Sequence, residues 1–163
     1  MTELKIRPAT DADHDGIWEI LEPVIRDGAT YPLDPALDRK GAFEYWLAAD
    51  KQCFVAERGG RVVGIYYIKP NSTGLGSHVA NAGYMVHPAA RQQGTAMAMA
   101  RDSFERAKDQ GFHAMQYNLV VASNDVALRL WQKLGLQVVG RLPEAFRHKR
   151  LGYVDALVLY KLL

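Results

Sequence analysis

The chain has 163 residues, of which 48% are hydrophobic, 23% are charged and 10% are aromatic, and its formal net charge is +2. This length fits one domain with one core, and the composition excludes a disordered, collagen-like or coiled-coil protein. The charge excess is too small to indicate nucleic acid or an anionic membrane as a partner, and the single cysteine, Cys53, allows neither an internal disulfide nor a cysteine-based metal cage.

The first half of the chain is predicted to form a strand, two helices and a hairpin. Residues 4–7 alternate apolar and basic side chains, as a half-buried strand does, and Asp11 or Asp13 can cap the helix that follows. Pro23 should kink this helix or end it early. The glycine turn at 58–61 lies between two β-rich segments and predicts an antiparallel hairpin. The apolar faces expected to be buried are Ile17, Leu21, Val24 and Ile25 in the first helix and Phe43, Trp46 and Leu47 in the second.

Strands and helices alternate along the second half of the chain, which predicts a mixed α/β fold. One helix follows Gly94 and ends at Gly111, and the next is capped by Ser123 or Asn124 and ends at Gly135. The expected strands span residues 79–86, 115–121, 136–142 and 154–162, with a solvated basic loop at 146–152 between the last two. The expected apolar stripes are Met97, Ala100, Phe104 and Ala107 in one helix and Ala127, Leu130, Trp131 and Leu134 in the other.

Between Tyr84 and Ala96 a strand runs directly into a turn and then into a helix. The first N–H groups of a helix have no partner within it, so they can converge on an anion such as a phosphate. Gly94 and Ala96 are small enough to leave these N–H groups accessible, and Arg91 can add a charged contact. The segment therefore predicts a phosphate-binding loop, the alternative being a glycine-containing turn that only starts a helix.

The order Arg91-Gln92-Gln93-Gly94-Thr95-Ala96 resembles the coenzyme A loop of the GCN5-related N-acetyltransferases (GNATs), which reads Arg/Gln-x-x-Gly-x-Gly/Ala. Residues 124–136 resemble the Asn-x-x-Ala-x-x-Leu-Tyr-x-x-x-Gly-Phe helix and turn of the same family. The order of strands from Leu4 to Leu162 also matches, so the likeness covers nearly the whole chain. It implies one N-acetyltransferase domain over residues 1–163, built on a mixed, mostly antiparallel sheet of about seven strands with helices on both faces.

The resemblance also implies a chemistry. In this family the strand before the last helix diverges from its neighbour and leaves a gap for the pantetheine arm of coenzyme A. An acetyl group passes directly from acetyl-CoA to an acceptor, usually an amine, without a covalent enzyme intermediate. The backbone N–H groups of Met85 and Val86 are the candidates for stabilising the oxyanion, and those of Val86 and His87 continue towards the coenzyme. The residues expected to bind the coenzyme are Met85, Val86, His87, Arg91, Gln92, Gln93, Gly94, Thr95, Ala96, Asn118, Asn124 and Trp131.

Two positions depart from the family pattern. Trp131 replaces the tyrosine often credited with protonating the leaving thiolate, and an indole N–H cannot release a proton at useful pH. Because Trp131 lies on the apolar stripe of its helix, a role in the core is at least as well supported as a contact with the coenzyme. Asn81 stands where phosphinothricin-type relatives carry a glutamate base, and we interpret it as an anchor for the substrate or the acetyl carbonyl. Asn81, Asn118 and Met85 are the catalytic candidates. Tyr31, in a loop that often covers the acceptor pocket in this family, joins Asn81 as a substrate-binding candidate.

Residues 81–88 and 116–120 look similar to the azetidine-2-carboxylate acetyltransferases, which acetylate the ring nitrogen of proline analogues. This likeness implies a small amino or imino acid as the acceptor. Two other functions stay open, a sensor that binds acyl-CoA without turnover and an N-acetyltransferase acting on proteins or peptides. A homodimer is carried over from relatives, and we expect no metal. Since the chain shows no secretory apolar region and no apolar run of about 18 residues, we expect a cytoplasmic protein without a membrane partner.

Overall fold

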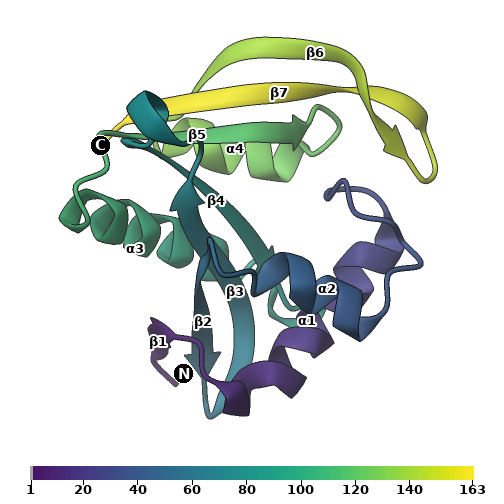
Figure 1. Ribbon diagram of the computed structural model, residues 1–163. Helices are drawn as coiled ribbons and strands as arrows, with labels where there is room; N and C mark the ends of the chain where they lie inside the picture. The colour runs from purple at the N-terminus through teal and green to yellow at the C-terminus, as the bar shows by residue number, and fades with distance from the viewer. Residues whose placement is uncertain (1) are drawn as a thin grey trace.

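The computed structural model describes residues 2–163, which form a seven-stranded sheet with helices on both faces (Figure 1). Neighbouring strands follow the order β1-β2-β3-β4-β5-β7-β6, and the pairs are antiparallel except for β4 with β5. This arrangement confirms the mixed, mostly antiparallel fold expected from the sequence. The strands are β1 (Leu4–Pro8), β2 (Gln52–Arg58), β3 (Arg61–Pro70), β4 (Val79–Val86), β5 (Ala114–Val121), β6 (Gln137–His148) and β7 (Gly152–Leu162).

The helices bury two hydrophobic clusters, one on each face of the sheet. Strand β4 serves both clusters because successive side chains of a strand point to opposite faces, so Ala82 and Tyr84 lie on one side and Met85 on the other. No helix in residues 2–163 is long and apolar enough to cross a membrane. The helices are α1 (His14–Asp27) and α2 (Arg39–Trp46) on the Met85 face, and α3 (Thr95–Asp109) and α4 (Asp125–Lys133) on the Tyr84 face (Figure 1).

Helix α1 continues past Pro23 and ends at Gly28, where a φ of 60° closes it in the left-handed conformation. The expectation that Pro23 ends the helix early is therefore wrong. Val24 and Ile25, which follow the proline directly, are buried under the sheet. Burying two such side chains contributes about 3–6 kcal/mol, which matches or exceeds the roughly 3 kcal/mol that a proline costs inside a helix.

The buried stripe of α3 differs from the prediction at one position. Met99 is fully buried, whereas Met97 is only half-buried. The first turn of α3 is pressed against β3 at Gly64, where an added Cβ would lie 2.8 Å from the Met99 sulfur and 2.9 Å from the Thr95 methyl carbon. This close approach fixes the start of α3 against the sheet.

The hairpin of β6 and β7 is longer than the sequence predicted. Strand β6 runs through Phe146 to His148, so the expected basic loop is reduced to a turn at 149–151. Phe146 and His148 are buried on either side of an exposed residue, which is the period of a strand rather than of a solvated loop. The turn docks on the end of α1, because the Lys149 N–H donates to the Gly28 carbonyl at 3.0 Å. The hairpin and the loop after α1 are thereby held side by side.

Candidate active site

Strands β4 and β5 separate after two residue pairs, and we call the gap between them the fork. Their parallel pairing covers residues 79–80 of β4 and 114–115 of β5, after which both strands continue without pairing to each other. At the closed end of the fork, the Asn81 side-chain amide donates to the Gln116 carbonyl oxygen at 2.9 Å. The divergence of strands that the family resemblance implied is therefore present in this chain.

The backbone of β4 presents alternate residues to the fork. The His87 N–H donates to the Val63 carbonyl of β3 at 2.8 Å. In an antiparallel ladder, hydrogen-bonded pairs alternate with non-bonded pairs, so Met85, opposite Ile65, also bonds to β3. The N–H groups of Met85 and His87 are therefore occupied, and the expectation that they face the thioester and the coenzyme is wrong. The groups that point into the fork belong to Tyr84 and Val86.

A tyrosine side chain already bonds the Tyr84 backbone in the fork. The Tyr31 hydroxyl accepts from the Tyr84 N–H at 2.7 Å and donates to the Tyr84 carbonyl oxygen at 3.0 Å. Gly83 makes this approach possible, since a Cβ there would lie 2.9 Å from the Tyr31 hydroxyl and 2.6 Å from a ring carbon of Tyr67. Within residues 2–163, the N–H and carbonyl of Val86 have no such partner.

Three aromatic side chains form the floor of the fork on the α3 and α4 side. The Trp131 ring lies 5.0 Å from that of Tyr84 and 4.9 Å from that of Tyr117, centroid to centroid. The Tyr84 hydroxyl is 2.9 Å from the Tyr117 hydroxyl and 2.6 Å from Ser103 Oγ. Burial raises the pKa of Tyr84 to about 12 and that of Tyr117 well above its usual value, so both phenols stay protonated at neutral pH. Trp131 is thus packed in the core beneath the fork.

The loop at residues 91–96, here called the coenzyme loop, has the geometry of an anion site. Gln92 and Gly94 adopt left-handed φ values of 60° and 78°, which turn successive N–H groups towards one side. The first bond of α3 runs from the Ala98 N–H to the Gly94 carbonyl. Within the described chain the N–H groups of residues 92–97 have no acceptor, and the Arg91 side chain is exposed and unpaired. These donors are free to bind a diphosphate.

Sequence reasoning missed a cation beside this loop. Arg58, at the end of β2, donates to the Gln93 side-chain oxygen at 2.7 Å, and the Gln93 amide donates to the Ala89 carbonyl at 3.3 Å. The Gln93 side chain is therefore committed to the protein, and only its backbone N–H stays available. Thr95 is buried and its hydroxyl has no partner in residues 2–163. The contact of Arg58 spans 35 residues, so no local pattern could have indicated it.

The three candidate asparagines come from three elements at the fork: Asn81 from β4, Asn118 from β5 and Asn124 from the start of α4. Asn124 caps α4, its side-chain oxygen accepting from the Ala127 N–H at 3.3 Å, which leaves its NH₂ group free. Asn118 is exposed and donates to the Asn71 side chain at 2.7 Å, while its own oxygen accepts from Gln116 at 3.0 Å. Asn81 and Asn118 are therefore linked through Gln116 rather than directly. Sequence reasoning did not single out Asn71.

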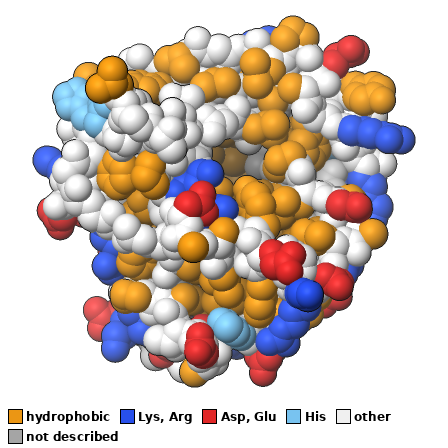
Figure 2. All heavy atoms as spheres, in the orientation of Figure 1, with side chains coloured by type: hydrophobic (Ala, Val, Ile, Leu, Met, Phe, Trp, Pro, Cys, Tyr) orange, Lys and Arg blue, Asp and Glu red, His pale blue; other side chains and the backbone are white. Residues whose placement is uncertain are grey.

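A cavity of about 510 Å³, here called the acceptor pocket, lies between the loop after α1 and the β6–β7 hairpin. Figure 2 shows the molecule hollowed near its centre, with hydrophobic side chains around the hollow. His148 Nδ1 accepts from the N–H groups of Arg150 and Leu151, at 3.1 Å each, so the ring proton of the neutral histidine is on Nε2. The lining residues are Gly28, Tyr31, Pro32, Leu33, Asp34, Pro35, Ala145, Phe146, Arg147, His148 and Lys149.

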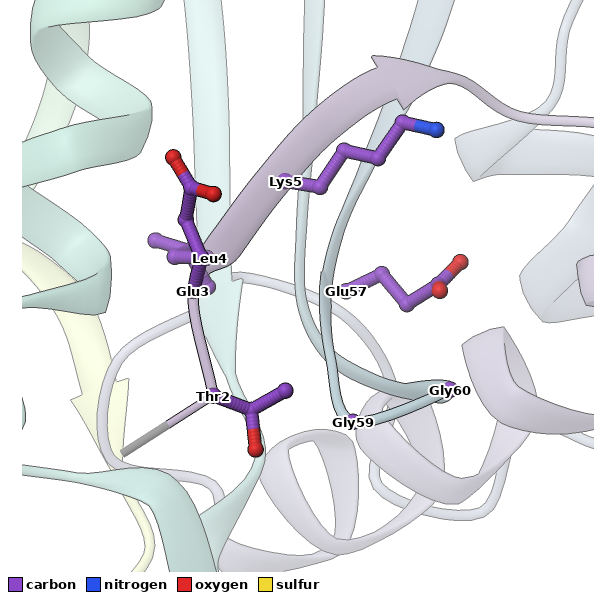
Figure 3. A pocket seen from close by; sticks show the side chains of 7 residues that line it. All are labelled: Thr2, Glu3, Leu4, Lys5, Glu57, Gly59 and Gly60. Atoms are coloured by element: carbon purple, nitrogen blue, oxygen red, sulfur yellow. The ribbon is translucent and has the colours of Figure 1, made fainter.

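A second cavity, of about 370 Å³, lies at β1 and the turn between β2 and β3 (Figure 3). It is lined by Glu3, Lys5 and Glu57 together with small residues, and Glu57 is already paired with Arg7 at 2.9 Å. Lys5 in β1 and Glu3, which precedes the strand, point in different directions (Figure 3). None of the residues that line the fork or the coenzyme loop borders this cavity.

Residues 17–136 match the model of the Acetyltransferase (GNAT) family. The chain belongs to the GNAT family. This acetyltransferase is 31% identical over 151 residues to N-acetyltransferase aca1 of Schizosaccharomyces pombe, an alignment that covers 82% of this chain and 72% of that protein. It is 39% identical to a GCN5-related N-acetyltransferase from Kribbella flavida, with a TM-score of 0.93 over 98% of both chains. YncA of Salmonella typhimurium, solved with acetyl-CoA, shares 22% identity at a TM-score of 0.84, covering 98% of this chain and 94% of that one.

Membership of this family makes the chain an N-acetyltransferase with acetyl-CoA as its co-substrate. The site fits the chemistry of this molecule at two places. The coenzyme loop offers free N–H groups suited to a diphosphate, and the backbone of Val86 in the fork offers one donor and one acceptor suited to an amide of the pantetheine arm.

Proposed function

We propose that this acetyltransferase moves the acetyl group of acetyl-CoA to the amine of a small molecule held in the acceptor pocket. The observation that carries the proposal is the position of Tyr31, which lines the pocket and also bonds the β4 backbone in the fork. The pocket and the fork therefore adjoin at one side chain. A volume of about 510 Å³ suits a small-molecule site. A small amino or imino acid is the favoured acceptor, as the likeness to the proline-analogue enzymes implies.

The coenzyme side of the reaction is assigned from the free donors. The N–H groups of residues 92–97 bind the diphosphate, with Arg91 adding charge. The Val86 backbone and the free amide of Asn124 bind the pantetheine arm. The Tyr84 N–H replaces that of Met85 as the group that stabilises the oxyanion, because a dipole aimed at developing charge lowers the barrier to thioester attack.

The acceptor side is assigned to Asn81. Its amide nitrogen holds the closed end of the fork, while its side-chain oxygen has no partner in residues 2–163. This oxygen can accept a hydrogen bond from the incoming amine and orient its lone pair. Asn81 and Asn118 do not line the acceptor pocket, so we assign Asn81 to the acceptor's amine in the fork and Asn118 to the support of Asn81 through Gln116. Neither amide can remove a proton.

We assign no protein base to the proton transfer, because the one carboxylate among the described residues that line the pocket is exposed, and a solvated carboxylate is a much weaker base than an amine. Asp34 is this carboxylate, and its Oδ1 accepts from the Ala36 N–H at 2.9 Å in a loop turn. His148 uses its unprotonated nitrogen for two backbone N–H groups. The amine therefore attacks in its neutral form, having lost one proton to water. The C–N bond forms and the carbonyl becomes an oxyanion; the carbonyl then re-forms, the C–S bond breaks, and the positively charged nitrogen loses its extra proton to water or to the leaving thiolate.

The test measures thiol release from acetyl-CoA across a panel of amino acids, imino acids, simple amines and a peptide with a free N-terminus. Release above the hydrolysis background with at least one small amine is the expected result. Transfer to the peptide alone would replace the proposal by peptide acetylation. Coenzyme binding without transfer to any member of the panel would favour the sensor function instead.

A further inference from the structure

The Tyr31 hydroxyl stands in an unusual place for a side chain, bonded to both backbone groups of one residue in a strand. It makes hydrogen bonds of 2.7 and 3.0 Å to the N–H and the carbonyl of Tyr84. These are the groups that would bond to β5 if the two strands stayed paired. The next outward pair, that of Val86, is open. One backbone N–H of the fork is therefore bonded by Tyr31, whereas that of Val86 has no partner in residues 2–163.

From this geometry we propose that Tyr31 is a catalytic residue: its hydroxyl occupies the site of the thioester oxygen until acetyl-CoA binds, and then donates a hydrogen bond to that oxygen. The inference rests on the proposed function, since it places the thioester at Tyr84. The thioester oxygen takes over the Tyr84 N–H, and the displaced hydroxyl turns its O–H from the Tyr84 carbonyl to the same oxygen. The oxyanion then has two donors, one from the backbone and one from Tyr31.

A ring contact and a raised pKa support this role. The ring of Tyr31 packs edge-on against Trp46 at 5.9 Å, so the hydroxyl is aimed by a buried partner. Burial also raises the pKa of Tyr31 far above its usual value, which keeps the phenol protonated and able to donate. Tyr31 gives up no proton in the reaction. The amine nitrogen bonds to the thioester carbon, the carbonyl re-forms as the C–S bond breaks, and the extra proton on the nitrogen goes to water or to the leaving thiolate.

The variant Tyr31→Phe tests the inference, because it keeps the ring on Trp46 and removes only the hydroxyl. Removing one oxyanion donor lowers turnover by about 100- to 1,000-fold, so we expect a loss of that size in kcat. The KM for acetyl-CoA should stay the same or fall, because the thioester no longer displaces a hydroxyl. A purely structural role would instead raise KM and lower the melting temperature together.

A second readout does not depend on turnover. The infrared carbonyl stretch of bound acetyl-CoA, labelled with ¹³C at the carbonyl, should lie at lower frequency in the wild type than in Tyr31→Phe. Tyr45→Phe is the matched control, since the Tyr45 hydroxyl pairs with Tyr67 at 3.5 Å and does not touch β4. That variant should leave both kcat and the carbonyl stretch unchanged.

The outcomes separate the two proposals. If the wild type binds acetyl-CoA and Tyr31→Phe keeps kcat within threefold or shows the same carbonyl stretch, the role of Tyr31 is refuted while the proposed function stands. If the wild type fails to bind acetyl-CoA at all, the proposed function and this inference fall together.

Discussion

Gly94 provides a direct test of the coenzyme loop, through a comparison of Gly94→Glu with the neutral variant Gly94→Gln. The φ of Gly94 is 78°, so either side chain costs about 1–2 kcal/mol of stability, and by the same amount in both variants. An added Cβ would meet no atom within 4 Å, so both variants should fold. The two side chains have nearly the same shape. Their comparison therefore isolates the effect of one negative charge beside the free N–H groups.

The size of the effect follows from Coulomb's law. Two unit charges about 4 Å apart repel by about 1 kcal/mol in water and about 4 kcal/mol at an effective dielectric of about 20. Since the loop is exposed, we expect the lower part of this range, or about 10- to 100-fold weaker coenzyme A binding by Gly94→Glu than by Gly94→Gln. Calorimetry measures the difference, which should shrink in about 0.5 M salt. Equal affinities of the two variants at low salt would refute the assignment of the diphosphate to this loop.

Three other predictions concern stability and pH. Hydrogen bonds from Arg7 lower the pKa of Asp13 to about 2, so the ionised carboxylate contributes about 2 kcal/mol at pH 7, a contribution lost as pH falls from about 4 to 2. Asp13→Asn should therefore lower the free energy of unfolding at pH 7 but not below pH 2, and a gap that persists there would contradict this reasoning. Gly83→Ala should cost about 1–3 kcal/mol through overpacking against Tyr67, measured by urea unfolding, and an unchanged midpoint would contradict it. Because the proposed reaction takes the acceptor amine in its neutral form, the inflection of kcat/KM with pH should move with the amine pKa of the acceptor, and a fixed inflection would indicate a protein base.

The sequence was sufficient for most helices and strands because their signals are local, whereas the arrangement of the sheet was implied by the family resemblance. The period of the apolar residues in α4 and the glycine turn between β2 and β3 both appear in the structure where they were expected. The left-handed Gly94 also starts α3 as predicted. Each of these features depends on a few neighbouring residues and not on contacts between distant parts of the chain.

The details of the site depend on contacts that no local pattern reports. Whether the N–H of Met85 or that of Tyr84 faces the fork is decided by the register of β4 on β3, and the alternation of residues along β4 does not report which face of the sheet each one takes. The hydroxyl of Tyr31 reaches Tyr84 across 53 residues of sequence. Burial of His148 reflects the docking of the hairpin on α1, which overrides the polar character of its neighbours.

The early separation of β4 and β5 has a consequence for how coenzyme and protein depend on each other. The backbone groups of Val86, which a paired β5 would bond, have no partner in residues 2–163, so the protein lacks the stabilisation that a continuous ladder would give there. A bound molecule that carries its own peptide-like groups can make the missing hydrogen bonds at Val86 without displacing any protein group. Bound coenzyme A should accordingly raise the melting temperature of the enzyme, because a ligand that binds only the folded state stabilises it.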